Sequence, residues 1–156
     1  MTNPQIAITV QLTPNPGIES GYDFSYSSTS PQVGADGTID LSNYGQDDVQ
    51  LVFTLAPVAG TQPTFAVNTQ HPNQIDEAIW FAEWPRPDPP PVPCPSSAGH
   101  ANSSFRNFDL PQPQVLQFVN KNNDNRRYAY ALRCQVPPGN AVIEDDPIII
   151  NKVSQL

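Results

Sequence analysis

Apolar and polar residues alternate along several short stretches of this chain. From Ile6 to Leu12, from Val49 to Leu55 and from Tyr128 to Val136, every second residue is large and apolar, and the residues between are smaller or more polar. A two-residue period is typical of a strand with one buried and one exposed face. These three stretches therefore predict strands, and they predict which side chains point into the core.

Shorter patterns extend this prediction along the chain. Strands are expected at residues 22–26, 38–41, 65–67 and 147–152, because turn residues flank each of them. Two apolar runs joined by an Asn- and Asp-rich turn lie between Val115 and Val136. This arrangement predicts a β-hairpin.

Residues 73–83 allow two interpretations. Asn73 could cap a short helix with Asp76 and Glu77 in its first turn. Alternatively, residues 79–83 could form a strand that leads into the prolines. We favour the strand for Ile79–Glu83.

Proline limits what the rest of the chain can form. The 156 residues include 19 prolines, and proline disrupts helix interiors and central strands. Seven of these prolines lie within residues 85–95. We expect one domain over residues 1–156, with an irregular proline-rich insertion at 85–113. A loop of this length in a compact domain is either functional or disordered.

Together these elements predict an all-β fold, namely an antiparallel immunoglobulin-like β-sandwich of about 7–9 strands with a long proline-rich insertion. The Cys-Trp-Cys order of an antibody domain is not present, because Trp80 and Trp84 both precede Cys94 and Cys134.

Two short motifs carry a resemblance. Tyr128, Tyr130 and Leu132 form a Y-x-Y-x-L strand, and Asp146–Asn151 form a D-P-x-I-x-N strand. Together with the alternation at 49–55, they resemble strands of many small, uncharacterised bacterial β-sandwich proteins. The resemblance implies a sandwich and a bacterial origin, and it supplies no site residues. The proline-rich insertion departs from that pattern.

The net charge of −8 narrows the classes of partner. Phosphate binding needs clustered Lys and Arg, so we expect no binding to nucleic acid or to an anionic membrane surface. No apolar run approaches the roughly 20 residues of a membrane span. The N-terminus lacks a basic region followed by an apolar core, so we expect no signal peptide and a cytoplasmic location. Export by a route without such a signal stays open.

Acidic and amide-rich turns are possible calcium ligands. Asp47-Asp48, Asp145-Asp146 and the turn at 122–125 offer oxygen atoms, but none has the spacing of an EF-hand loop. Asn and Asp also favour tight turns, because they tolerate a positive φ angle. We interpret all three as turns, and we expect no metal or cofactor.

Cysteine and histidine give one candidate for catalysis. Cys134 follows the apolar phase of its strand, so we expect it to be buried. Cys94 lies in the proline-rich segment near His100, and the pair could form a thiol or metal site. Whether Cys94 and Cys134 form a disulfide is open. Catalytic groups need rigid support, and Cys94 and His100 lie in a segment that we expect to be an irregular loop. We therefore expect the protein not to be an enzyme.

The remaining candidates point to binding. Pro87 and Pro90 belong to a tract with P-x-x-P spacing, which can dock on aromatic grooves. Trp80 and Trp84 precede this tract, and His100 follows it. We interpret the chain as a non-catalytic binding or protein-interaction module for an unknown protein partner. The alternatives are a small metal-dependent or thiol enzyme around Cys94 and His100, and a structural subunit that forms homo-oligomers through an exposed edge strand.

Overall fold

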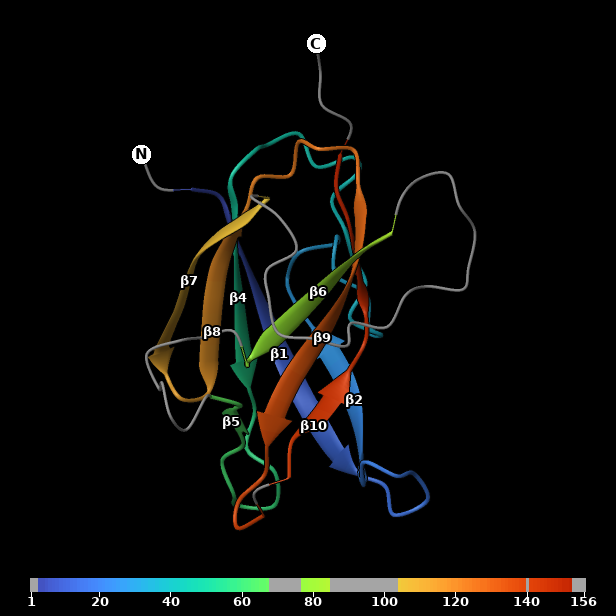
Figure 1. The fold of residues 1–156 in the computed structure, drawn as a ribbon, viewed down its shortest axis with the longest axis vertical. Coiled ribbons are helices and arrows are strands. Elements are labelled where there is room, and N and C mark those ends of the chain that lie inside the picture. Colours follow the sequence, from blue (N-terminus) through green and yellow to red (C-terminus); the bar gives the residue numbers. More distant parts are fainter. Residues whose placement is uncertain (1–2, 68–76, 85–103, 140, 153–156) are drawn as a thin grey trace.

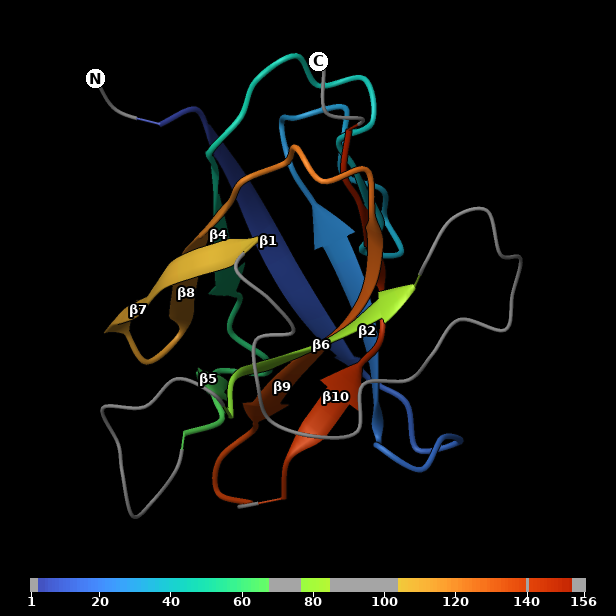
Figure 2. The ribbon, with the colours of Figure 1, turned by 45° about the horizontal axis from the view of Figure 1, so that its top comes forward.

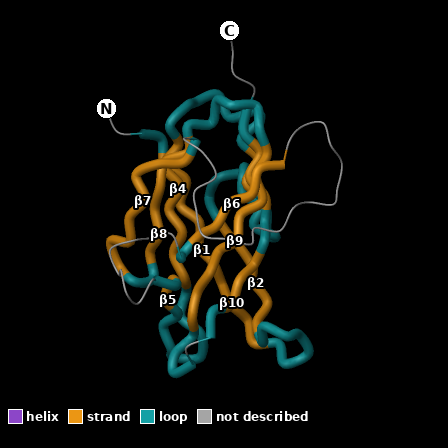
Figure 3. Tube along the Cα trace, viewed as in Figure 1, coloured by secondary structure: helices purple, strands orange, loops and turns teal. Residues whose placement is uncertain are grey.

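The computed structural model describes residues 3–67, 77–84, 104–139 and 141–152. Within these residues every regular element is a strand (Figure 3). Eleven strands form two sheets that face each other across an apolar core (Figure 1). The prediction of an all-β protein is confirmed. No helix in the described part of the chain is long and apolar enough to cross a membrane.

The first sheet has five strands in the order β2-β1-β4-β8-β7. Its strands are β1 (Gln5–Pro14), β2 (Tyr22–Ser27), β4 (Val49–Leu55), β7 (Phe105–Gln112) and β8 (Val115–Asn120). Alternate residues of β1 and β4 are buried, as the sequence pattern predicts. Their other side chains form the outer face of the sheet.

The second sheet is organised around β9 (Arg127–Gln135). One side of β9 pairs with β10 and β11, and the other side pairs with β5 and β6. In Figures 1 and 2, β6 and β9 cross in front of β1. The remaining strands are β3 (Ile39–Asp40), β5 (Thr64–Phe65), β6 (Ile79–Trp84), β10 (Ile143–Asp145) and β11 (Ile148–Ile150).

Aromatic rings fill the space between the sheets. The ring of Phe53 on β4 lies 6.0 Å from that of Phe118 on β8 and 5.8 Å from that of Tyr130 on β9. Phe81 on β6 stacks on Phe105 on β7 at 4.1 Å. Such contacts add about 0.5–1.5 kcal/mol each to the burial of apolar surface. The Phe53–Tyr130 and Phe81–Phe105 contacts join strands of one sheet to strands of the other, whereas Phe53–Phe118 joins two strands of the first sheet.

The predicted antiparallel arrangement needs a correction. Strand β1 runs parallel to β4, and β11 runs parallel to β3. Parallel neighbours need a long connection, and the chain supplies one in each case because other strands intervene in sequence. The number of strands also exceeds the prediction, because β3, β5, β10 and β11 have only two or three residues each and give little periodic signal.

The predicted hairpin from Val115 to Val136 is wrong. Its two halves, β8 and β9, belong to different sheets and do not pair with each other. Strand β8 pairs with β4 and β7 instead. The segment between them, residues 121–126, passes from one sheet to the other and is here called the crossing. A local turn signal shows that the chain changes direction but does not identify the strand beside it.

Three buried asparagines hold this crossing. Asn120, Asn122 and Asn151 are fully buried, where polar side chains need hydrogen-bond partners. Asn120 Nδ2 donates to Asn151 Oδ1 at 2.7 Å, and Asn151 Nδ2 donates to Asn120 Oδ1 at 3.1 Å. Asn122 Nδ2 donates to the carbonyl of Gln46 at 3.0 Å, and its Oδ1 accepts from the Lys152 amide at 2.9 Å. The final Asn of the D-P-x-I-x-N motif thus fastens the last strand to the crossing.

Asp124 adds a charged group to the same crossing. Its carboxylate accepts hydrogen bonds from the hydroxyls of Tyr128 and Ser104, from Asn151 Nδ2 and from the Arg126 amide. Burial is the largest single influence on its pKa and acts to raise it. The hydrogen bonds together outweigh burial and hold the pKa of Asp124 below its ordinary value. The ionised carboxylate is therefore a structural part of the crossing.

The Asn-rich turn has the backbone expected of a turn. Asn122 and Asn125 have φ angles of 53° and 56°, in the left-handed region that asparagine tolerates better than most residues. Among the described residues, no group of three or more His, Cys, Asp or Glu side chains is arranged to hold a metal ion.

The insertion predicted as irregular over 85–113 is partly a strand. Residues 105–112 form β7, which pairs with β8 in spite of two register shifts. These shifts, together with Pro111 and a φ angle of 59° at Asn107, interrupt the alternation that would have revealed a strand.

The strand favoured at Ile79–Glu83 is confirmed and extends to Trp84. Residues 73–76 lie outside the described residues.

The core makes a direct prediction about stability. Phe53 and Leu132 are fully buried on opposite sheets, whereas Gln50 lies on the outer face. We expect Phe53→Ala and Leu132→Ala each to lower the free energy of unfolding by about 2–5 kcal/mol. The matched change Gln50→Ala should cost far less. Urea denaturation of the three variants measures this, and equal losses would show that the assigned faces are wrong.

Candidate functional site

The residues predicted for binding are only partly within the described structure. Trp80 and Trp84 both belong to β6, where they pair with Ala131 and Arg127 of β9. Pro87, Pro90 and His100 lie outside the described residues, as does Cys94. The proposed role of the proline tract therefore stays a prediction. Of the five predicted residues, Trp80 is the one whose surroundings the structure shows.

Trp80 is half-buried on the outer side of β6 and is covered by a cation. The Arg133 guanidinium carbon lies 3.6 Å from the centroid of the indole ring. The same guanidinium contacts Glu77 Oε2 at 2.8 Å and Glu144 Oε2 at 3.3 Å. A cation over an aromatic face contributes about 0.5–2 kcal/mol, more as the pair is desolvated. The Arg133 side chain is only 13% exposed, and its positive charge is balanced by Glu77 and Glu144. The surface formed by Trp80 and Arg133 is here called the Trp80–Arg133 wall.

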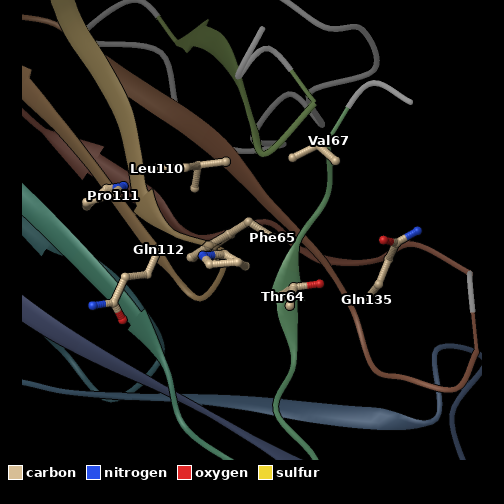
Figure 4. A pocket seen from close by; sticks show the side chains of 8 residues that line it. Thr64, Phe65, Val67, Leu110, Pro111, Gln112 and Gln135 are labelled. Carbon is tan, nitrogen blue, oxygen red and sulfur yellow. The ribbon is translucent and has the colours of Figure 1, made fainter. Parts of the chain in front are cut away.

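A pocket of about 310 Å³ opens at Gln135, the last residue of β9 (Figure 4). It is formed by β5 and Val67, by the end of β7 with its turn, and by the last residue of β9. Its lining consists of Thr64, Phe65, Val67, Leu110, Pro111, Gln112, Pro113 and Gln135. No lining residue carries a charge, although the chain has a net charge of −8. The pocket therefore offers an apolar interior with hydroxyl and amide groups in its wall.

Backbone hydrogen bonds fix the floor of the pocket. The Phe65 amide donates to the Pro113 carbonyl at 2.9 Å, and the Ala66 amide donates to the Arg133 carbonyl at 3.0 Å. Thr64 pairs with Gln135 in register. The short strand β5 is thus tied to the β7–β8 turn on one side and to β9 on the other. A site held by strands in this way is preorganised for a ligand.

Most of this site could not be read from the sequence. Phe65 and Val67 were predicted as a short strand, and Leu110 and Pro111 were assigned to the irregular insertion. Nothing local indicates that these two segments meet. The signal that could have helped is the spacing Pro111-Gln112-Pro113, because proline is confined to edge strands and turns within a sheet.

A second polar contact joins the sheets at β2 and β10. The Tyr26 hydroxyl donates to Asp145 Oδ2 at 2.7 Å, and the Tyr130 hydroxyl donates to the Gly37 carbonyl at 2.6 Å. Burial raises the pKa of Asp145; the hydrogen bond from Tyr26 acts against this, and the negative charge of Asp146 adds to it. The ionised form of the Asp145 carboxyl group is therefore less stable here than in water.

Cys134 lies beside this contact and is poorly suited to catalysis. It is a buried free thiol, as the strand pattern predicted. Burial, with a smaller influence from the charge of Asp145, raises its pKa to about 12. A thiol is nucleophilic as the thiolate, so at neutral pH almost none of Cys134 is in the reactive form.

The raised pKa of Asp145 predicts a pH-dependent gain from removing its charge. Because the pKa is higher in the folded than in the unfolded state, Asp145 stabilises the fold below its unfolded value of 3.8, and this contribution is lost as pH rises through the folded pKa. At pH 7 the folded chain therefore carries an unfavourable charge. Asn keeps an oxygen that can accept the Tyr26 hydrogen bond. We expect Asp145→Asn to raise the free energy of unfolding at pH 7, and this difference from wild type should vanish near pH 3.

Urea denaturation at both pH values tests this expectation. Asp109→Asn, which removes one charge from an exposed position on β7, is the control for net charge. A loss of stability in Asp145→Asn at pH 7, or the same gain in Asp109→Asn, would contradict the account of this contact.

Comparisons with known proteins add little. No protein-family model matches the chain, and no curated protein matches it closely enough to count as a relative. Among solved structures, the chain is similar to the inclusion body protein PixA from Burkholderia cenocepacia J2315, with 12% sequence identity over 99% of this chain and 98% of that chain. The TM-score is 0.28, which is too low to support an argument about fold or function. The candidate site therefore stands on its own geometry.

Proposed function

We propose that this chain is a non-catalytic binding module that captures an uncharged, apolar side chain of a protein partner in the pocket between β5 and β7. The observation that carries the proposal is the pocket itself. It is concave, its lining is uncharged, and its floor is held by backbone hydrogen bonds. Ligand sites are commonly apolar hollows with a few polar groups that fix orientation.

The size of the pocket supports a side chain rather than a large cofactor. Its volume of about 310 Å³ lies at the lower end of known ligand pockets. Complete burial of one Leu, Ile, Phe or Met side chain contributes roughly 1.5–3 kcal/mol. A single anchor of this kind gives weak binding, so a useful partner needs further contacts nearby.

The Trp80–Arg133 wall can supply those contacts. Arg133 and Gln135 are successive outward residues of β9, about 7 Å apart along a strand. Gln135 lines the pocket, while Arg133 covers Trp80. Aromatic and arginine side chains are frequent at the centres of interfaces. A peptide anchored in the pocket could therefore also contact this wall.

The alternative of a thiol or metal enzyme has less support. Its proposed residues, Cys94 and His100, lie outside the described residues. The thiol that the structure does describe, Cys134, is buried and has a raised pKa. The binding module remains the function that the described geometry supports best.

A titration with side-chain analogues tests the proposal directly. N-acetyl-leucine amide and N-acetyl-phenylalanine amide should shift the backbone NMR signals of Thr64–Val67 and Leu110–Gln112 in a saturable way. N-acetyl-glutamate amide should not, because the pocket has no positive charge to receive a carboxylate. We expect weak affinities, on the order of millimolar, for such small ligands.

Two matched valines supply the control. Val67 is 39% exposed in the pocket wall, and Val142 is 40% exposed in the loop before β10. Val67→Asp should abolish the saturable shifts, whereas Val142→Asp should leave them unchanged. Absence of saturable shifts in the wild type, or equal effects of the two substitutions, would refute binding at this pocket.

A further inference from the structure

Strand β9 is buried on both of its faces. Its inward residues pack against the first sheet, but its outward residues Ala129 and Ala131 are also 0% exposed. The sequence agrees, because a continuous apolar run such as Tyr128–Leu132 is typical of a strand that is covered on both sides. Strand β1 of the first sheet also has a paired strand on each side, yet its outward Ala7 is exposed. The outer face of β9 therefore has a cover that the outer face of β1 lacks at Ala7.

The neighbouring strands do not account for this cover. In register, Ala129 lies between Ala82 of β6 and Ile148 of β11, and Ala131 lies beside Trp80. Side chains stand roughly perpendicular to a sheet, so these neighbours shield an alanine methyl group from the side rather than from above. In Figures 1 and 2 the outer face of β6 and β9 is toward the viewer, and no other strand of the described chain lies in front of it.

The cover belongs to this chain. The exposure of Ala129 is that of one chain alone, so neither a second copy nor a separate protein is needed to bury it. Residues 85–103 are the longest stretch of the chain outside the described residues. They are therefore the first candidate for the segment that lies over β9.

Both ends of residues 85–103 are tied to the beginning of β9. Trp84, which precedes them, pairs with Arg127 in register. Ser104, which follows them, accepts a hydrogen bond from the Tyr128 hydroxyl at 3.4 Å. The chain thus leaves the second sheet and returns to it at the same end of the same strand, next to the buried alanines.

The length of the segment is sufficient to pass over both alanines and return. As a polyproline II helix, residues 85–95 would span about 34 Å, at about 3.1 Å per residue. The four residues of β9 from Arg127 to Ala131 span about 13 Å. The remaining residues 96–103 reach about 26 Å when extended, which is enough to bring the chain back to Ser104.

The composition of residues 85–95 suits an apolar sheet face. Seven of these residues are proline, which has no backbone N–H. A segment packed on apolar side chains usually buries N–H groups that then need partners, and proline removes much of that need. Its two charges, on Arg86 and Asp88, cancel each other. The proline tract is also stiff, so little conformational entropy is lost when it packs on the sheet.

We propose that the proline-rich segment 85–103 packs on the outer face of β9 of its own chain, over Ala129 and Ala131. The second sheet is then the middle of three layers. The P-x-x-P tract serves the fold of its own chain in this arrangement instead of an aromatic groove on another protein. The pocket between β5 and β7 is not part of the contact, so this inference is independent of the proposed function.

Thiol accessibility tests the proposal with matched positions. Ala129→Cys and Ala7→Cys are each made in a Cys94→Ser background, in which the remaining native thiol, Cys134, is buried. In the full chain, a small aromatic disulfide reagent should modify the Ala129→Cys variant at least about a hundred-fold more slowly than the Ala7→Cys variant, because reaction at position 129 requires local opening.

The same two substitutions are then made in a chain whose residues 85–103 are replaced by a Gly-Ser linker of equal length. This replacement should raise the reaction rate at position 129 at least about ten-fold and leave the rate at position 7 unchanged, because only position 129 loses its cover. Circular dichroism confirms that each variant is folded. Equal rates at the two positions in the full chain would show that the face is open. Protection of position 129 that persists in a folded linker variant would place the cover elsewhere in the chain. Either result overturns the proposal.

Proton NMR of the wild type decides the question if the linker variant does not fold. Nuclear Overhauser contacts should join the proline rings of residues 85–95 to the methyl groups of Ala129 and Ala131, and none should join them to the methyl group of Ala7. The lack of any such contact from residues 85–103 to the two β9 alanines would likewise refute the packing.

Discussion

The structure depends on one strand being paired along both of its edges and packed through its inner face. Strand β9 pairs with β10 and β11 on one side and with β5 and β6 on the other. Its inner residues, including Tyr128, Tyr130 and Leu132, are fully buried. Every other element of the second sheet except β3 takes its position from this strand. Small changes in β9 would therefore be transmitted to both layers.

The position of β9 also determines the candidate site. Gln135 at its end lines the pocket, and Arg133, two residues earlier, covers Trp80. Its beginning is fixed by the crossing from β8, where the buried Asn120 and Asn151 bond to each other and Asn151 also donates to the half-buried Asp124. The beginning of β9 thus helps to fasten the two sheets to each other. Its end forms part of the surface that we propose binds a partner.

The residues that could be predicted are those with a regular local period. Alternation along β1, β4 and β9 indicated both strands and their inward faces, because burial of one face imposes that period. Strand β7 was missed, because Arg106, Asp109 and Pro111 interrupt any alternation and its pairing shifts register. The hairpin at Val115–Val136 was wrong, since adjacency in sequence does not decide pairing. The pocket was not predictable for the same reason. Its walls come from segments that only tertiary folding brings together.

Hydrogen exchange resolved by residue tests most directly whether β9 organises the fold. The Tyr130 amide donates to the Pro147 carbonyl at 2.8 Å, and the Arg133 amide donates to the Ala78 carbonyl at 2.9 Å. If β9 is the strand on which the others depend, these amides exchange only through global unfolding, and their exchange free energies equal that measured by urea denaturation. Amides of the edge strand β7 should exchange through smaller, local openings. If β9 amides exchanged as readily as those of β7, the second sheet would open independently, and the central role of β9 would be contradicted.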